Sequence, residues 1–259
     1  MKALDKKLVR DLAAMKGQAL AIASVVACGI AVFVMSMTTL HSLQGAKQSY
    51  YAEKRFAHLF SSLVRAPVAI AGRAAQIDGV AAVEHRVVES MTLDMPGMIG
   101  LASGRVVSLP EVPGRGLNQL YIKSGRWPDP ARPGEVVIGE AFAEAHGLEI
   151  GAQLDATLRG QRQPLSVVGV VLSPEYVIQV EPGSLFPDDK RFGVFWMTRR
   201  QLAAAADMEG AFNDLSVLLA KGANAEEVIR EIDILLAGYG GAGAYSRRDH
   251  YSARFVDDE

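Results

Sequence analysis

The feature that most constrains this chain is an uncharged stretch from Gly17 to Leu40. Its 24 residues include no Asp, Glu, Lys, Arg or His. An α-helix rises about 1.5 Å per residue, so about 20 apolar residues cross the hydrocarbon core of a bilayer. The stretch therefore predicts a transmembrane helix, with a short head before it and a large body after it.

The charges that flank this stretch predict its orientation. Five basic residues precede it, against two acidic ones: Lys2, Lys6, Lys7, Arg10 and Lys16 against Asp5 and Asp11. Basic residues beside a membrane span tend to stay in the cytoplasm, so residues 41–259 are expected on the other side. Leucines recur at helical spacing in the head, which is therefore either a basic amphipathic helix on the membrane surface or the start of a signal anchor.

The span is expected to stay in the mature protein. The apolar core of a cleavable signal has about 7–15 residues and ends at a small-residue cleavage site, and this stretch is longer and has no clear site. Cys28 is the only cysteine, which excludes an internal disulfide and a cysteine-rich zinc site. Apolar residues continue after Cys28, which favours a plain intramembrane cysteine over a lipidated one. The net charge of −2 argues against a nucleic-acid-binding protein.

The segment after the span reads as more helix. Phe56, Leu59, Phe60 and Leu63 have the spacing of one apolar helical stripe, which predicts a helix over 41–64. It is either a stalk that continues the span or the first packed helix of the body. Pro67 ends it and suits the first turn of a short helix to about Gln76, before a turn at Asp78-Gly79.

The remainder of the body predicts strands and helices in irregular alternation. Predicted strands cover 80–93, 98–109, 116–122, 135–139, 154–158, 165–172, 192–197 and 215–219, and predicted helices cover 140–146, 198–206 and 225–236. Gly147 is a plausible end for the first of these helices and Thr198 a plausible start for the second. This order favours an α+β fold with antiparallel or mixed sheets.

Four regions follow from these patterns. Residues 1–16 form the basic head, 17–40 the transmembrane helix, 41–78 a stalk with connecting helices, and 79–259 an extracytoplasmic α+β core domain. Residues 125–128, which read Gly-Arg-Trp-Pro, are expected to form a structural corner with Trp127 as its apolar anchor.

The known catalytic and nucleotide-binding motifs that we considered are missing. The chain has no GxxxxGK[ST], HExxH or GxSxG sequence, and its five histidines have no metal-ligand spacing, so they are expected at surfaces or helix ends. Gly238 to Gly243 matches GxGxxG, but it follows a predicted helix, so it predicts a glycine turn and no dinucleotide site. Asp188-Asp189 and the terminal 257–259 trio read as a solvated loop and a chain end. We expect no catalytic, cofactor-binding or metal-binding residue.

Several blocks, taken in order, carry a resemblance to a family. LDKKLVRDL precedes the span, and YYAEKRFAHLFSSLVRAP, SGRWP, EVVIGEAFA and VVGVV follow it. The chain resembles the N-terminal part of an FtsX-like or MacB-like ABC transporter permease, the group that includes lipoprotein-release permeases. The resemblance implies a first transmembrane helix, then a MacB-like periplasmic core domain, in a bacterial inner membrane, and no enzyme activity.

The resemblance also implies a mechanism and partners. In such permeases a separate cytoplasmic ATPase moves the spans, and the motion reaches the outer domain, where it drives export or extraction. A stiff helix would transmit that motion, whereas a Gly/Ser linker would absorb it. The implied partners are the lipid bilayer, an ABC ATPase subunit and other permease segments or subunits, with no cofactor.

Two other readings remain open. Members of the family have at least four spans and this chain has one, so it is expected to be a fragment or a split subunit. The main alternative is a single-pass, membrane-anchored periplasmic interaction or sensor domain without ATP coupling. A membrane-anchored enzyme is the third reading, and the missing catalytic motifs count against it.

Overall fold

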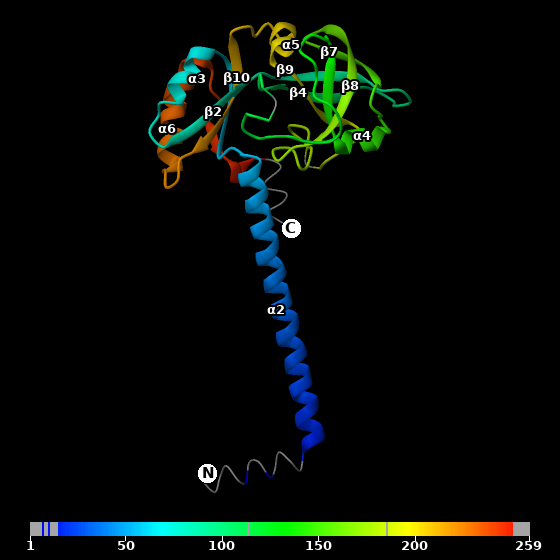
Figure 1. Cartoon of the computed structure of the whole chain (residues 1–259), viewed down its shortest axis with the longest axis vertical. Helices are drawn as coiled ribbons and strands as arrows, with labels where there is room; N and C mark the ends of the chain where they lie inside the picture. The colour runs from blue at the N-terminus through cyan, green and yellow to red at the C-terminus, as the bar shows by residue number, and fades with distance from the viewer. Residues whose placement is uncertain (1–6, 8–9, 11–14, 113, 185, 251–259) are drawn as a thin grey trace. The chain divides into compact units, whose positions relative to one another are not determined.

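Figure 1 shows the computed structural model, which describes residues 7, 10, 15–112, 114–184 and 186–250. The chain divides into two compact units, residues 1–50 and 51–259. Most of the predicted amphipathic head and the acidic trio at 257–259 lie outside the described residues.

The first unit is dominated by one long helix, α2, at Lys16–Glu53. It covers the whole predicted span and is long and apolar enough to cross a membrane. Large apolar side chains along it are exposed instead of packed in a core, including Leu20, Ile30 and Phe33. The predicted helix at 17–40 is confirmed.

The helix ends earlier than the sequence pattern predicts. The Arg55 N–H donates to the Ala52 carbonyl and the Phe56 N–H to the Tyr51 carbonyl, while Arg55 has a φ of 48°. These two bonds around a left-handed residue are a Schellman motif, and the Tyr51 and Phe56 rings make its usual apolar contact at 4.8 Å. The predicted continuation to residue 64 is wrong after Glu53, because this stop closes the helix.

Beyond the stop, the chain enters a small antiparallel sheet with the strand order β11-β1-β10-β2. The strands are β1 at Leu59–Pro67, β2 at Val80–Arg86, β10 at Ala211–Leu219 and β11 at Ala244–Ser246. Helices α3, at Val68–Ala74, and α6, at Ala225–Leu236, pack on one face (Figure 1). Leu59 and Leu63 face these helices and Phe60 the opposite cluster, so the predicted stripe is divided between two faces of a strand.

The larger sheet has the strand order β5-β8-β6-β9-β4-β3-β7, and β7 also pairs with β8. This extra pairing closes six of its strands into a barrel, with β5 as an additional strand on β8. The strands are β3 at Val88–Asp94, β4 at Ala102–Leu109, β5 at Tyr121–Gly125, β6 at Glu135–Gly139, β7 at Gln153–Leu158, β8 at Gln161–Leu172 and β9 at Phe192–Thr198.

Alternating side chains build the two apolar layers of the barrel. Val136 and Ile138 of β6 belong to one buried cluster and Val137 to another, as the period of two in a strand requires. Two short helices pack beside it, α4 at Glu140–His146 and α5 at Arg199–Ala205. The mixed α+β fold that the sequence predicts is confirmed.

Several predictions agree closely with the structure. The strand at 135–139, the helix at 140–146 with left-handed Gly147 after it, and the hairpin of β7 and β8 are confirmed. Thr198 does precede α5, but its side chain makes no capping bond. The predicted strand at 80–93 is two strands that belong to different sheets.

The Gly-Arg-Trp-Pro corner is also present. Gly125 has a φ of 82°, and a Cβ there would lie 2.3 Å from the Val168 carbonyl oxygen. Arg126 beside it forms a two-bond ion pair with Glu135. Trp127 is half-buried against the outer barrel cluster, so it packs as an anchor that solvent partly reaches.

Candidate functional site: a buried charge cluster beside the junction segment

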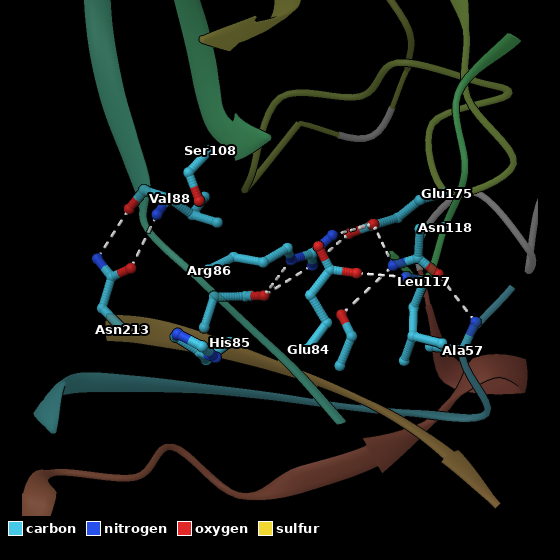
Figure 2. Close-up of polar contacts among 12 residues, drawn as sticks. Ala57, Glu84, His85, Arg86, Val88, Ser108, Leu117, Asn118, Glu175 and Asn213 are labelled. Atoms are coloured by element: carbon cyan, nitrogen blue, oxygen red, sulfur yellow. Dashed lines mark hydrogen bonds and ion pairs between the residues drawn. The ribbon is translucent and has the colours of Figure 1, made fainter. Parts of the chain in front are cut away.

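The chain crosses from the small sheet to the larger one at a single residue. Arg86 is the last residue of β2 and Val88 the first of β3, so only Val87 lies between the sheets. Side chains hold this crossing on both sides. The Ser108 hydroxyl accepts from the Val87 N–H at 2.9 Å, and the Asn213 amide forms two 2.8 Å bonds with the backbone of Val88 (Figure 2).

Arg86 is the centre of a buried charge cluster at this crossing. Its guanidinium donates two hydrogen bonds to Glu175, at 2.5 and 2.9 Å, and a third to Asp214 at 2.7 Å. Arg86 is 5% exposed, and Glu175 is 3% exposed. Glu175 comes from the loop after β8 of the larger sheet, whereas Arg86 and Asp214 lie on β2 and β10, so the cluster connects the small sheet to a loop of the larger one. Bidentate pairing of this kind fixes geometry as well as charge.

Asn118 joins the cluster to residues 54–60, which we call the junction segment because they follow α2 directly. The Asn118 amide donates to Glu175 at 2.8 Å and to Ser216 at 3.3 Å. Its oxygen accepts from the Ala57 N–H at 2.8 Å, as Figure 2 shows. Asn118 has a φ of 50°, a left-handed conformation that asparagine tolerates better than most residues.

The junction segment is fixed by its backbone as well. The Asn118 N–H donates to the Arg55 carbonyl at 3.1 Å, and the Gln119 N–H donates to the Lys54 carbonyl at 2.8 Å. The side chains of Phe56 and Ala57 are fully buried, and they pack with Phe60 and Leu117. The segment is therefore an integral part of the second unit's core and is not a solvated linker.

The last described part of the chain, residues 244–250, lies against the same segment. Strand β11 pairs with β1, and the Arg247 N–H donates to the His58 carbonyl at 2.8 Å. The Arg247 guanidinium lies 5.0 Å from the Tyr51 ring and 5.2 Å from the Phe56 ring, within cation–π range. The 3-10 turn η2 at Arg247–Asp249 leads to His250, which packs on Phe60.

The electrostatics of the cluster are asymmetric. Burial would raise the pKa of Glu175, but the Arg86 charge and hydrogen bonds outweigh it, so this pKa is lowered. Burial dominates at Asp214 and raises its pKa despite Arg86. Burial also raises the pKa of the Tyr176 hydroxyl, which interacts with Arg105. Glu175 is therefore ionised beside Arg86, and Tyr176 stays neutral at ordinary pH.

The histidines correct one prediction. His250 is 6% exposed, with Nε2 3.8 Å from Glu175, and burial lowers its pKa, so its predicted position at a surface is wrong. His146 does end α4, and His41 is exposed. His58 is partly buried, and its Nδ1 accepts from the Leu219 N–H. His85 is partly buried beside the Phe212 ring.

Among the described residues, no group of His, Cys, Asp and Glu side chains could hold a metal ion. The glycine motif follows α6 and includes the 3-10 turn η1 at Ala237–Tyr239, so the predicted turn is confirmed. Gly240 has a φ of 71°, and a Cβ there would lie 2.6 Å from the Val64 side chain, so close packing explains this glycine. Asp188 and Asp189 lie in a loop, where Asp188 accepts from nearby backbone N–H groups.

Sequence reasoning missed the charge cluster entirely. Arg86 is separated from Glu175 by 89 residues along the chain and from Asp214 by 128. The sequence contains only a weak signal. Arg86 ends a strand-forming run, and Glu175 follows the apolar strand at 165–172. The charges of the cluster are directed at one another, so they fix the positions of the loop and strands that carry them.

The chain is similar to one known protein family and to several solved structures. A family model described as the MacB-like periplasmic core domain matches residues 12–235. The periplasmic region of MacB from Actinobacillus actinomycetemcomitans has a TM-score of 0.45 and 11% identity, over 80% of this chain and 94% of that one. The extracellular domain of the noncanonic ABC-type transporter YknZ from Gram-positive bacteria has a TM-score of 0.45 and 14% identity, over 73% and 98%. No curated protein sequence matches.

Proposed function

This chain belongs to the family of MacB-like periplasmic core domains, and we propose that it is a permease component of an ABC transporter of the FtsX, MacB or lipoprotein-release type. In this proposal a separate cytoplasmic ATPase drives an export or extraction step on the far side of the membrane. The chain itself performs no catalysis and holds no cofactor. Its partners are the lipid bilayer, the ATPase and further permease segments or subunits.

The proposed location is a bacterial inner membrane. Helix α2 crosses the bilayer, the basic head lies in the cytoplasm, and the second unit lies on the periplasmic side. The exposed apolar side chains of α2 support this location, because in water they would be costly to leave uncovered. The basic residues before the span support the orientation.

One observation carries the coupling proposal, namely the fixation of the junction segment. Helix α2 ends at Glu53, and Phe56 and Ala57, which follow it shortly, are buried in the second unit. Asn118 then connects Ala57 to Glu175 and, through it, to Arg86 at the crossing of the two sheets. These contacts support the proposal that a displacement of the junction segment reaches both sheets, as a mechanically coupled permease requires.

The location is tested by reporter fusions to the full-length chain. An alkaline phosphatase fused after residue 250 is expected to be active, and one fused within the head to be inactive. The same fusions with a fluorescent protein that matures only in the cytoplasm should give the opposite pattern. Activity at the head, or release of the untagged chain from membranes without detergent, would contradict the proposal.

The ATPase partner is tested by purifying the tagged full-length chain from its host's membranes in mild detergent. An ATP-hydrolysing subunit with a P-loop should co-purify, and vanadate should inhibit the hydrolysis. A tagged single-pass protein of unrelated fold serves as the control. If the chain is membrane-bound but enriches no ATPase over this control, the sensor or interaction reading is correct.

A further inference from the structure

A second site lies beside strand β2, on the edge of the small sheet. A groove of about 400 Å³ is lined by residues 82–85 of β2, by residues 110–112 and 115–117 after β4, and by Arg55 and Arg199. The volume is in the range of binding pockets for small ligands. Val112 in its wall is an apolar side chain that is 53% exposed.

The groove follows the free edge of the sheet. β2 is the last strand in the order β11-β1-β10-β2. Four consecutive residues of β2 line the groove, although successive side chains point to opposite faces of a strand. A hollow along the edge contacts all four, so the lining fits a groove that reaches the backbone of β2.

The backbone groups at this edge can be assigned from the neighbouring bonds. The Val217 carbonyl of β10 accepts from the His58 N–H at 2.8 Å, so Val217 bonds on the side of β1. Val83 is its register partner on β2 and therefore directs its N–H and C=O away from β10. His85 has the same parity, and its carbonyl accepts from Arg199. Val83 thus presents a donor and an acceptor to the groove.

Three arginines surround this edge with no carboxylate within ion-pair distance in the described residues. No ion pair within 4.0 Å involves Arg55, Arg115 or Arg199 in the described parts of the chain, whereas Arg86, Arg126 and Arg162 all have carboxylate partners. The Nε of Arg199 is buried without an acceptor. Buried donors are rarely left unpaired, so this one indicates a missing partner.

Two carboxylates, Glu84 and Glu111, also line the groove and attract the Arg199 guanidinium from beyond ion-pair distance. Glu84 is engaged by the backbone N–H of Leu117, and burial raises its pKa. Glu111 is exposed and lies within 4.0 Å of none of the described arginines' guanidinium nitrogens. Arg55 and Arg115 therefore remain available to an anionic ligand, whereas the charge of Arg199 is partly compensated.

We propose that this groove binds an extended acidic peptide segment of a partner protein, which adds to β2 as an extra strand. Edge strands are open to such pairing, in which main-chain bonds supply affinity and side-chain contacts supply specificity. Acidic side chains of the peptide pair with Arg55, Arg115 and Arg199, and an apolar one covers Val112. A second copy of this chain fits poorly, because paired β2 edges would bring arginines together. A lone phosphate would leave the strand edge unused.

The inference goes beyond the proposed function and does not rest on it. A peptide can bind this edge whether or not an ATPase is attached, and the binding assay contains no ATP. A failure of ATPase co-purification and a failure of peptide binding are therefore separate results.

The probe is a fluorescent EVEVEVE peptide with blocked ends, titrated onto the full-length chain in an uncharged detergent. We expect saturable binding that weakens as salt is raised, because exposed charges contribute to it. The charge-reversed KVKVKVK peptide and an EVEVEVE peptide with alternate N-methylated amides should bind at least tenfold more weakly. The N-methylated peptide tests the strand pairing, since it keeps the charges and loses the backbone N–H donors along one edge.

Variants locate the binding. Arg115→Glu is expected to weaken EVEVEVE binding at least tenfold, while Arg230→Glu on α6 makes the same charge change on an exposed side chain outside the groove and should leave binding within twofold. Hydrogen exchange should show new protection of the Val83 amide on peptide binding. This measurement does not depend on a variant that could misfold.

Three results would overturn the proposal. The first is the lack of saturable EVEVEVE binding at millimolar concentration. The second is an equal effect of Arg115→Glu and Arg230→Glu, or bound peptide without protection of the Val83 amide. The third is binding of phosphatidylglycerol nanodiscs or inorganic phosphate that Arg115→Glu abolishes while the peptide fails to bind, which would make the groove an anion site of another class.

Discussion

The Arg86 cluster and the groove beside β2 both contain arginine side chains, but they use them in opposite ways. At the crossing of the sheets, Arg86 is 5% exposed and its donors are directed at Glu175 and Asp214. At the strand edge, a few residues away, three arginines have no carboxylate within ion-pair distance in the described residues. Charge that is internally paired holds the fold together, and charge left unpaired at a strand edge is available for recognition. The contrast predicts large effects on stability at one site and on binding at the other.

The largest expected effect comes from breaking the cluster. Arg86→Met leaves Glu175 buried without its counter-ion, and removal of one partner of a buried ion pair costs about 3–5 kcal/mol. Chemical unfolding of the purified chain would measure this loss. The double variant Arg86→Met/Glu175→Leu should recover part of it, since the Glu175 carboxylate is then removed as well and only the Asp214 carboxylate loses a partner. Equal stability of the single variant and the parent would refute the structural role of Arg86.

A smaller loss is expected when the junction segment is released. Asn118→Gly retains access to the left-handed backbone conformation and removes the amide that binds Ala57 and Glu175. Leaving these buried groups unpaired costs about 1–3 kcal/mol. Hydrogen exchange should show faster exchange of the Ala57 amide, with little change in α6, where Asn224 caps the helix. An unchanged Ala57 exchange rate would show that Asn118 does not fix the segment.

The stability of the protein should depend on pH through His85, which lies beside Arg86 and lines the groove. Burial and the Arg199 charge lower the pKa of His85 to about 4, below its value of about 6.5 in an unfolded chain. The stability contribution of His85 is therefore fully present above about pH 6.5 and is lost as the pH falls toward 4, because the unfolded state binds the proton first.

His85→Phe keeps an aromatic ring beside Phe212 and removes this titration. Melting temperatures at pH 7.5 and pH 5 should therefore differ less in the variant than in the parent. Other groups that titrate in this range, including His58 and His250, contribute equally to both proteins. The same acid sensitivity in both proteins would exclude His85 as a contributor.

The smallest expected effect on stability is at the groove itself. Arg115 is exposed and has no ion pair within the described residues, so Arg115→Glu should change the free energy of unfolding by less than about 0.5 kcal/mol. Chemical unfolding without peptide would measure it. A loss of several kcal/mol would make Arg115 a structural residue like Arg86, and the contrast between the two sites would disappear.

The sequence predicts the barrel well where local signals agree with the tertiary structure. Residues 135–139 are a short apolar run and Gly147 follows a helical pattern, and both elements occur where predicted. At the junction the signals conflict. The helix stop uses Arg55 in a conformation that glycine usually supplies, so it left no mark in the sequence. Pairing of β1 with β10 and β11 then outweighs a stripe of helical spacing.

The candidate site was beyond sequence reasoning for a different reason. No Gly or Pro marks the change of sheet at Val87, which is held by Ser108 and Asn213 from distant strands. The partners of Arg86 also come from distant segments, and their pairing depends on the closed barrel and the small sheet forming together. Residue types could suggest charges to be paired, but only the topology brings these particular charges into contact.

The left-handed stop at Arg55 carries a further consequence. An L-residue in this conformation costs about 1–2 kcal/mol, which Arg55→Gly would relieve, although glycine's greater freedom in the unfolded chain offsets part of the gain. The melting temperature should rise slightly while affinity for the acidic peptide falls. A single residue thus sets stability against recognition, and a screen for more stable variants would select proteins that bind the acidic peptide more weakly.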